Sequence, residues 1–72
     1  MDLIIDRGRE RIGFEFKCAA SVTPRDWGTL QQSLVEGVID RAYLLYLGDR
    51  AFQAVDRITV ISAGDFLIRD DW

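Results

Sequence analysis

The stretch from Asp2 to Cys18 constrains the fold of this chain more than any other. Two runs in which apolar and polar residues alternate flank a charged centre that contains a glycine. This pattern is typical of two strands joined by a tight turn. Gly8-Arg9 is the expected two-residue turn, because a type II′ turn favours glycine at its first central position. The sequence therefore predicts a β-hairpin with strands over residues 1–7 and 10–18.

This turn pairs Arg7 with Glu10 and so fixes the register of the hairpin. One face then carries the apolar side chains of Leu3, Ile5, Ile12, Phe14 and Phe16. The opposite face carries Asp2, Ile4, Asp6, Arg11, Gly13, Glu15 and Lys17. Cβ atoms of directly opposed residues lie about 5 Å apart, so Asp2 and Glu15 are expected side by side. A turn that begins one residue earlier keeps both faces but moves Asp2 opposite Gly13.

Asp2, Glu15 and Lys17 form the candidate catalytic site. Two carboxylates give Mg²⁺ or Mn²⁺ an anionic oxygen corner and leave positions open for water. A nearby ammonium group can orient the attacking water and offset the charge that develops on a phosphate. The alternative is that these residues are the solvent-facing charges of a half-buried strand. The chain has no histidine and one cysteine, so any metal is expected to be one that prefers oxygen ligands.

The segment after the hairpin predicts a helix. Thr23 is the expected N-cap, Pro24 occupies the first helical position, and Asp26 places an acid in the first turn. Gly37 is the expected stop. Apolar residues recur at helical spacing and predict a buried stripe of Trp27, Leu30, Leu34, Val35 and Val38. The helix is expected to cover the sheet, with Trp27 as a core or interface anchor.

The second half of the chain predicts further strands. Residues 41–47 are almost continuously apolar, as expected of a central strand that is covered on both faces. Residues 57–61 read as another strand, residues 52–56 are ambiguous, and residues 63–67 are a short helical turn or a loop. The tail, 69–72, is expected to fray. The prediction is a single α/β (α+β) domain over residues 1–72, a small mixed sheet with β-β-α-β-β order.

Composition narrows the classes of function. An apolar content of 49% in 72 residues indicates one small globular domain, and its small core leads us to expect association with a second copy, as a dimer, or with another domain. The net charge of −3 argues against a free-standing, high-affinity nucleic-acid binder. The start of the chain has no basic leader, and no apolar run approaches the ~20 residues of a membrane span. The expected location is the cytoplasm.

The acid in the first strand and the Glu15-Phe16-Lys17 sequence in the second resemble the PD-(D/E)xK pattern of restriction-endonuclease-like nucleases. Over most of its length the chain is similar to the C-terminal nuclease-like domain, of unknown function, of bacterial predicted AAA-type ATPases. The similarity covers Asp2-Leu-Ile-Ile, Gly13-Phe-Glu-Phe-Lys, Ser21-Val-Thr-Pro, Arg41-Ala-Tyr-Leu-Leu-Tyr-Leu-Gly48, Ile58-Thr-Val-Ile and Asp65-Phe-Leu.

The resemblance implies a restriction-endonuclease-like core that lacks its N-terminal helix. It also implies that Asp2 and Glu15 are the metal carboxylates and Lys17 the catalytic ammonium, in a Mg²⁺-dependent endonuclease or exonuclease acting on DNA. The alternative is a catalytically inactive nuclease-like module that serves in oligomerisation or protein interaction with an ATPase. A stand-alone relative, a shortened gene product and a cloned fragment all remain open as its origin.

Other polar residues of the hairpin have weaker functional interpretations. Arg7, Arg9 and Arg11 are candidate phosphate contacts near the cleft, although charges at a hairpin tip also serve solubility and protect a sheet edge. Opposite Arg11, Asp6 is expected to form a cross-strand ion pair. Cys18 follows Lys17 onto the apolar face and is predicted to be a small buried side chain rather than a nucleophile.

Overall fold

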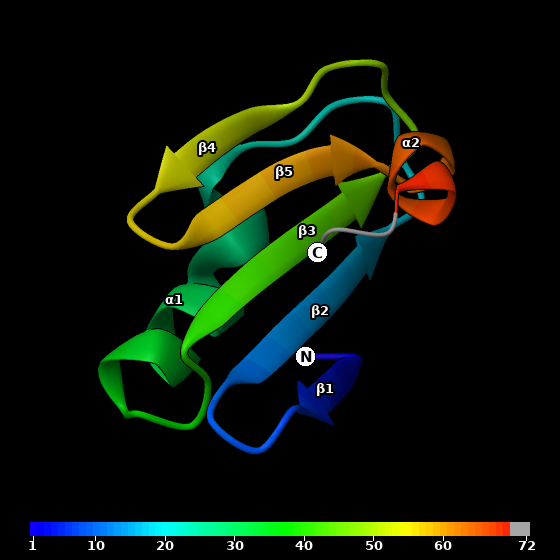
Figure 1. The fold of residues 1–72 in the computed structure, drawn as a ribbon. Helices are drawn as coiled ribbons and strands as arrows, with labels where there is room; N and C mark the ends of the chain where they lie inside the picture. The colour runs from blue at the N-terminus through cyan, green and yellow to red at the C-terminus, as the bar shows by residue number, and fades with distance from the viewer. Residues whose placement is uncertain (70–72) are drawn as a thin grey trace.

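The computed structural model describes residues 1–69; part of the predicted frayed tail, residues 70–72, lies outside this range. Figure 1 shows the strands and helices along the chain. They are β1 (Leu3–Asp6), β2 (Arg11–Lys17), the 3₁₀ helix η1 (Pro24–Trp27), α1 (Gly28–Val35), β3 (Arg41–Tyr46), β4 (Phe52–Val55), β5 (Ile58–Ser62) and α2 (Ala63–Ile68). The predicted α+β class with a mixed sheet is confirmed.

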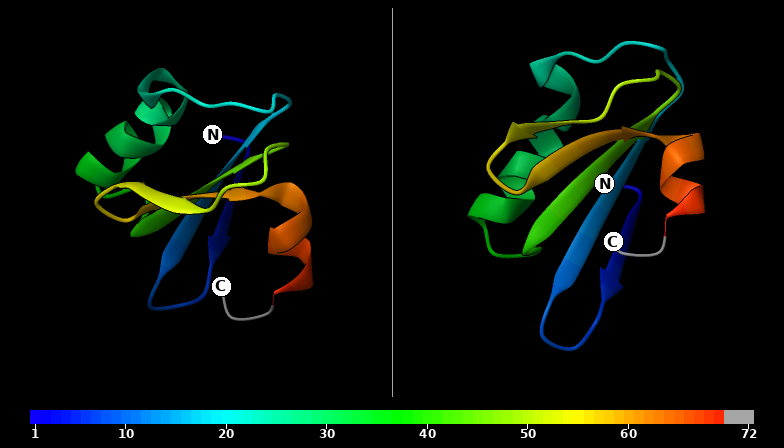
Figure 2. Two further views of the ribbon diagram at one scale, coloured as in Figure 1. Left: turned by 90° about the horizontal axis from the view of Figure 1, so that it is seen from above. Right: turned by 45° about the horizontal axis from the view of Figure 1, so that its top comes forward.

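The five strands form one sheet in the spatial order β1-β2-β3-β5-β4. The three inner strands β2, β3 and β5 are parallel, and the two edge strands β1 and β4 are antiparallel to their neighbours. Parallel neighbours need a crossover connection, and α1 lies in the one between β2 and β3. Figure 2 shows α1 and α2 on opposite sides of the sheet.

The register of the hairpin is the one that the sequence predicts. Leu3 pairs with Phe14, Ile4 with Gly13, Ile5 with Ile12, and Asp6 with Arg11. The N–H of Arg7 donates to the carbonyl of Glu10, and Gly8 has a φ of +84°. That left-handed conformation favours glycine, which explains why the turn forms here.

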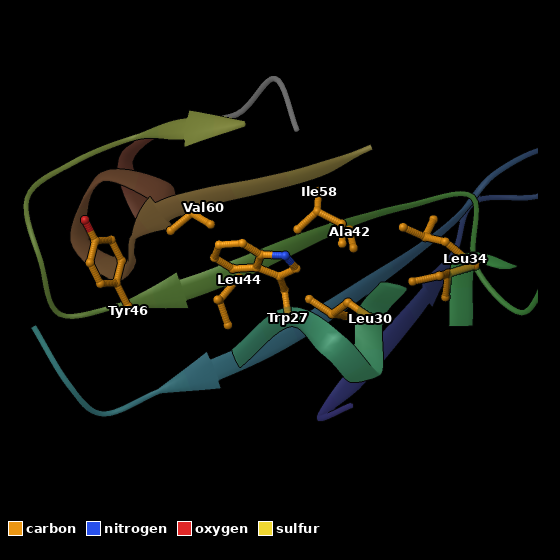
Figure 3. Close-up of a cluster of buried hydrophobic side chains, with 9 residues drawn as sticks. Trp27, Leu30, Leu34, Ala42, Leu44, Tyr46, Ile58 and Val60 are labelled. Atoms are coloured by element: carbon orange, nitrogen blue, oxygen red, sulfur yellow. The ribbon is translucent and has the colours of Figure 1, made fainter. Parts of the chain in front are cut away.

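The sheet is covered by α1 on one face. Trp27, Leu30 and Leu34 point from this helical segment into the larger core, where the indole ring of Trp27 lies among Leu44 and Ile58 (Figure 3). The core also contains Ile39, Ala42, Tyr46 and Val60. The other face packs against α2 through Ile12, Phe14, Tyr43, Leu45 and Ile61, with Phe66 against them. Strand β3 is therefore buried on both faces, as its apolar sequence predicts.

The predicted helix begins and ends close to the expected residues. Thr23 and Asp26 form the capping box, and Gly37 has a φ of +76° just beyond the last turn. The apolar stripe is shorter than predicted, because Val35 is 78% exposed and Val38 is 40% exposed. Leu34, in the same last turn, is the residue that the helix turns to the core, and Val38 follows after the helix has ended at Val35.

Two segments whose structure the sequence left ambiguous are regular elements. Residues 52–55 form the edge strand β4, paired with β5, and residues 63–68 form α2, whose N-cap Ser62 accepts a hydrogen bond from the N–H of Asp65. The order is therefore β-β-α-β-β-β-α, with one strand and one helix more than predicted. None of the helices in residues 1–69 is long and apolar enough to cross a membrane.

Phe16 lies on the predicted apolar face and is 53% exposed. Two predictions about the hairpin side chains are wrong. Cys18 is exposed, because β2 ends at Lys17 and the chain leaves the sheet there. Arg11 forms its ion pair with Asp40, at 3.7 Å, while the Asp6 carboxylate accepts the N–H of Gly8.

Candidate functional site

Glu15 and Lys17 lie at the carboxyl-terminal end of β2, on the face that α1 covers. They alternate with Phe16, so both side chains point to one side of the sheet. Glu15 is beside Leu44 of β3. Glu15 and Lys17 line a hollow of about 320 Å³. The structure therefore brings the two residues of the Glu-x-Lys motif to one surface cavity.

The crossover supplies the opposite wall of this hollow. Arg25 and Asp26 come from η1, and Thr29 comes from the first turn of α1. Asp26 is fixed by the helix start, because its Oδ2 atom accepts the N–H of Thr23 at 2.7 Å. The wall is thus built by the capping residues that begin the helix. We call this cavity the Glu15–Lys17 hollow; its lining residues are Glu15, Phe16, Lys17, Arg25, Asp26, Thr29 and Leu44.

An ion pair spans the hollow. The ammonium nitrogen of Lys17 donates to Oδ2 of Asp26 at a distance of 2.5 Å, and both side chains are partly buried. The hydrogen bond from Lys17, together with the one from the Thr23 N–H, lowers the pKa of the Asp26 carboxyl below its usual value. Asp26 therefore stays ionised at neutral pH and holds the Lys17 ammonium in place.

Asp2 lies just before β1, and its carboxylate is turned to the backbone of β2. Its N–H donates to the carbonyl of Phe14 at 2.9 Å, and its Oδ2 atom accepts the N–H of Phe16 at 2.8 Å. The carboxylate thus occupies a place in the hairpin ladder where a backbone carbonyl of the neighbouring strand commonly accepts. Asp2 is exposed, and its side chain does not line the Glu15–Lys17 hollow.

The Glu15 carboxylate pairs with the amino group of Met1 and not with a group of the hollow. Its Oε2 atom lies 3.4 Å from the amino group of Met1, and both groups are partly buried. Glu15 therefore faces the beginning of β1 as well as the hollow. The backbone of Asp2 is bonded to Phe14, next to Glu15, yet the two carboxylates make separate interactions.

The carboxylates of Glu15 and Asp2 fit a water-rich metal site better than a cage made of protein ligands alone. Within residues 1–69 there is no group of three or more His, Cys, Asp or Glu side chains that could hold a metal ion. An all-protein cage is thus not formed by the described residues. Mg²⁺ commonly binds through one or two carboxylates, several waters and substrate phosphate oxygens. Glu15, with Asp2 just before the neighbouring strand, fits that water-rich arrangement in its chemistry.

The three arginines of the hairpin lie at the other end of β2. Lys17 is six positions after Arg11, which corresponds to about 20 Å along a strand. The guanidinium of Arg11 is bound to the Gly37 carbonyl at 2.6 Å and to Asp40. Figure 1 shows the hairpin tip at the end of the sheet opposite to the loop that leads to α1. Arg7, Arg9 and Arg11 are therefore not at the Glu15–Lys17 hollow.

The sequence did not identify Arg25, Asp26 and Thr29 as site residues. The only signal was the capping pattern Thr23-Pro-Arg-Asp26, which predicts a helix start and not its position against the sheet. That position depends on how the crossover packs over β2 and β3. Of these three residues, Asp26 is the one that contacts Lys17, the predicted catalytic residue.

No protein-family model matches the chain, and no curated protein or solved structure matches it significantly. The function is therefore inferred from the side chains around the Glu15–Lys17 hollow and their contacts.

Proposed function

We propose that this chain is a metal-dependent phosphodiesterase domain of the PD-(D/E)xK type that hydrolyses phosphodiester bonds in DNA. The observation that carries the proposal is the position of Glu15 and Lys17 on one hollow, with Asp2 bonded to the intervening Phe16. An acid, a Glu-x-Lys strand and a cavity of this size are the parts that such a reaction requires.

Each residue has a stated role in this proposal. A Mg²⁺ or Mn²⁺ ion, when bound, supplies Lewis acidity and a water of lowered pKa. Glu15 and Asp2 are the residues that would hold it, and the Oδ2 atom of Asp2 accepts the N–H of Phe16 in the structure. Lys17 orients the attacking water and offsets negative charge on the phosphate. Asp26 holds the ammonium of Lys17 in position.

The proposal includes kinship with the restriction-endonuclease-like fold without its N-terminal helix. It is supported by the antiparallel hairpin that carries the acid and the Glu-x-Lys motif, followed by a crossover helix and a parallel strand. An AAA-type ATPase is the partner that the family resemblance suggests. A cytoplasmic location belongs to the same proposal.

Titration of Mg²⁺ or Mn²⁺ into the purified protein, followed by NMR or calorimetry, tests the metal site. Binding in the millimolar range or tighter is expected, with shifts centred on Glu15, and Glu15→Gln is expected to abolish it. Glu36→Gln is the matched control, because Glu36 is an exposed carboxylate at the far end of α1 that accepts from Gln32. Absence of binding, or equal binding by the Glu15→Gln protein, refutes the proposal. Cleavage of single-stranded, duplex and branched DNA by wild type and Lys17→Ala then tests the reaction.

A second candidate is a nuclease-like module without catalytic activity that acts in oligomerisation or protein interaction. Two observations favour it: Lys17 is held by Asp26, and Asp2 is used in the hairpin ladder. Several apolar side chains are also exposed, among them Leu3, Phe16, Leu67 and Ile68. Analytical ultracentrifugation separates the two candidates. A dimer at low micromolar concentration without metal binding favours this second one, and a monomer that cleaves DNA excludes it.

A further inference from the structure

Arg25 is a cation at the Glu15–Lys17 hollow that the proposed reaction does not yet use. Its side chain is exposed and lines the cavity. Within residues 1–69, no ion pair or side-chain hydrogen bond is formed by Arg25. By contrast, Arg11 is paired with Asp40, Arg41 with Glu10, and Arg57 with Asp56.

The charges around the hollow leave Arg25 uncompensated. Four charged side chains line the cavity, namely Glu15, Lys17, Arg25 and Asp26. Lys17 and Asp26 neutralise each other at 2.5 Å, and the Met1 amino group lies 3.4 Å from Glu15. The guanidinium is thus the group in this set that is open to an anion from solution. An anion is therefore expected on the Arg25 wall.

Thr29 adds a neutral donor beside Arg25. The two residues are four positions apart across the junction of η1 and α1, and both line the hollow. A guanidinium with a hydroxyl next to it suits the non-bridging oxygens of a phosphate, because the planar fork donates two parallel hydrogen bonds.

We infer that Arg25, assisted by Thr29, binds a phosphodiester group of the nucleic-acid substrate in the Glu15–Lys17 hollow. The inference rests on the proposed function, since it names the substrate contact of that same site. It assigns phosphate binding to the start of the crossover helix and not to the arginines of the hairpin tip. A phosphate held on this wall faces Glu15 and Lys17 across the same cavity.

The test measures binding of a short fluorescein-labelled oligothymidylate by fluorescence anisotropy in EDTA, where no divalent metal is available. Arg25→Gln is compared with Arg9→Gln, which removes the same charge at the opposite end of the sheet. Arg25→Gln is expected to raise the Kd about fivefold to tenfold. It is also expected to reduce the slope of log K against log salt by about 0.7, measured between about 50 and 200 mM salt. Arg9→Gln is expected to change the Kd less than about twofold. Arg25→Lys is expected to fall between wild type and Arg25→Gln, because it keeps the charge and loses the fork.

Equal weakening by Arg25→Gln and Arg9→Gln overturns the inference, because it indicates attraction to overall charge. No weakening by Arg25→Gln, or no binding by wild type, also overturns it. Circular dichroism of Arg25→Gln, Arg25→Lys and Arg9→Gln checks that each variant is folded. A Mg²⁺ titration of Arg25→Gln separates this inference from the proposed function. If Arg25→Gln binds metal and the oligonucleotide as wild type does, the inference alone is refuted. If Arg25→Gln weakens oligonucleotide binding but wild type binds no metal, the proposed reaction alone is refuted.

Discussion

The ammonium nitrogen of Lys17 lies 2.5 Å from Oδ2 of Asp26, so the end of β2 is tied to the first turn of the crossover helix. The same oxygen accepts the N–H of Thr23 at 2.7 Å. One carboxylate thus caps the helix and positions the lysine of the Glu-x-Lys motif. The geometry of the Glu15–Lys17 hollow is therefore coupled to the formation of the helix start.

Asp26→Asn is expected to make stability less dependent on pH. The hydrogen bond from Lys17, and then that from the Thr23 N–H, lowers the pKa of Asp26 in the folded protein below its usual 3.8. A group whose folded pKa is lowered favours the folded state above its unfolded pKa. That advantage is lost as the pH falls through about 3.8 toward the folded value. Urea midpoints measured from pH 7 to pH 3 should therefore fall more steeply for wild type than for Asp26→Asn.

Asparagine keeps an oxygen that can accept the Thr23 N–H, so this variant isolates the ion pair from the cap. Other carboxylates titrate in both proteins and cancel in the comparison. A difference in midpoint between wild type and Asp26→Asn that stays constant down to pH 3 would contradict the prediction.

Two substitutions at Asp2 separate its structural role from a metal role. The Oδ2 atom of Asp2 accepts the N–H of Phe16 at 2.8 Å. Asp2→Asn keeps an acceptor oxygen and should retain wild-type stability, but it removes the charge and should weaken Mg²⁺ binding. Asp2→Ala removes both and should lower the free energy of unfolding by about 1 kcal/mol. Urea unfolding and metal titration of both variants check this, and equal metal binding by Asp2→Asn and wild type would show that Asp2 is only structural.

The hairpin register follows from the sequence because local information determines it. The position of Gly8 selects the turn, and the alternation of apolar residues on either side selects the faces. Shifting the register by one residue would expose Ile12 and Phe14, which are both buried. The central strand Arg41–Tyr46 is predictable for a similar reason, since its apolar run suits only a strand that is covered on both faces.

The site residues on the crossover do not follow from the sequence, because their position depends on non-local packing. Nothing in the capping pattern places Asp26 against Lys17. The burial errors have the same origin. Val35 fits the helical period of the stripe, but the helix turns Leu34 to the core and leaves Val35 78% exposed. Cys18 fits the strand period, but the strand has already ended at Lys17.

Gly13→Ala is expected to lower the free energy of unfolding by about 1–3 kcal/mol. A Cβ atom at this position would lie 2.7 Å from Cδ1 of Ile39 and 2.5 Å from the sulfur of Met1. Ile39 is buried in the core and has little room to move, so the clash is relieved only by shifting the sheet edge or the Ile39 side chain.

Gly28→Ala is the control for this substitution. Gly28 begins α1 with helical φ and ψ, and a Cβ atom there would meet nothing within 4 Å. Alanine at this position is expected to leave stability unchanged or to raise it by up to about 1 kcal/mol. Urea unfolding of both variants measures the difference, and similar midpoints for the two would contradict the close approach at Gly13.

Leu30→Ala and Val35→Ala test which residues of α1 attach the helix to the sheet. Leu30 is completely buried among Trp27, Leu44 and Ile58, so its truncation should cost about 2–5 kcal/mol. Val35 is 78% exposed on the same helix, so its truncation should change stability by no more than about 0.5 kcal/mol. Urea unfolding followed by tryptophan fluorescence gives both values, because Trp27 is buried in the same core. Leu30→Ala also removes the support under η1 and should loosen the Lys17–Asp26 pair. Equal costs for the two substitutions would mean that the last turn of α1 is covered in solution by something other than the described residues.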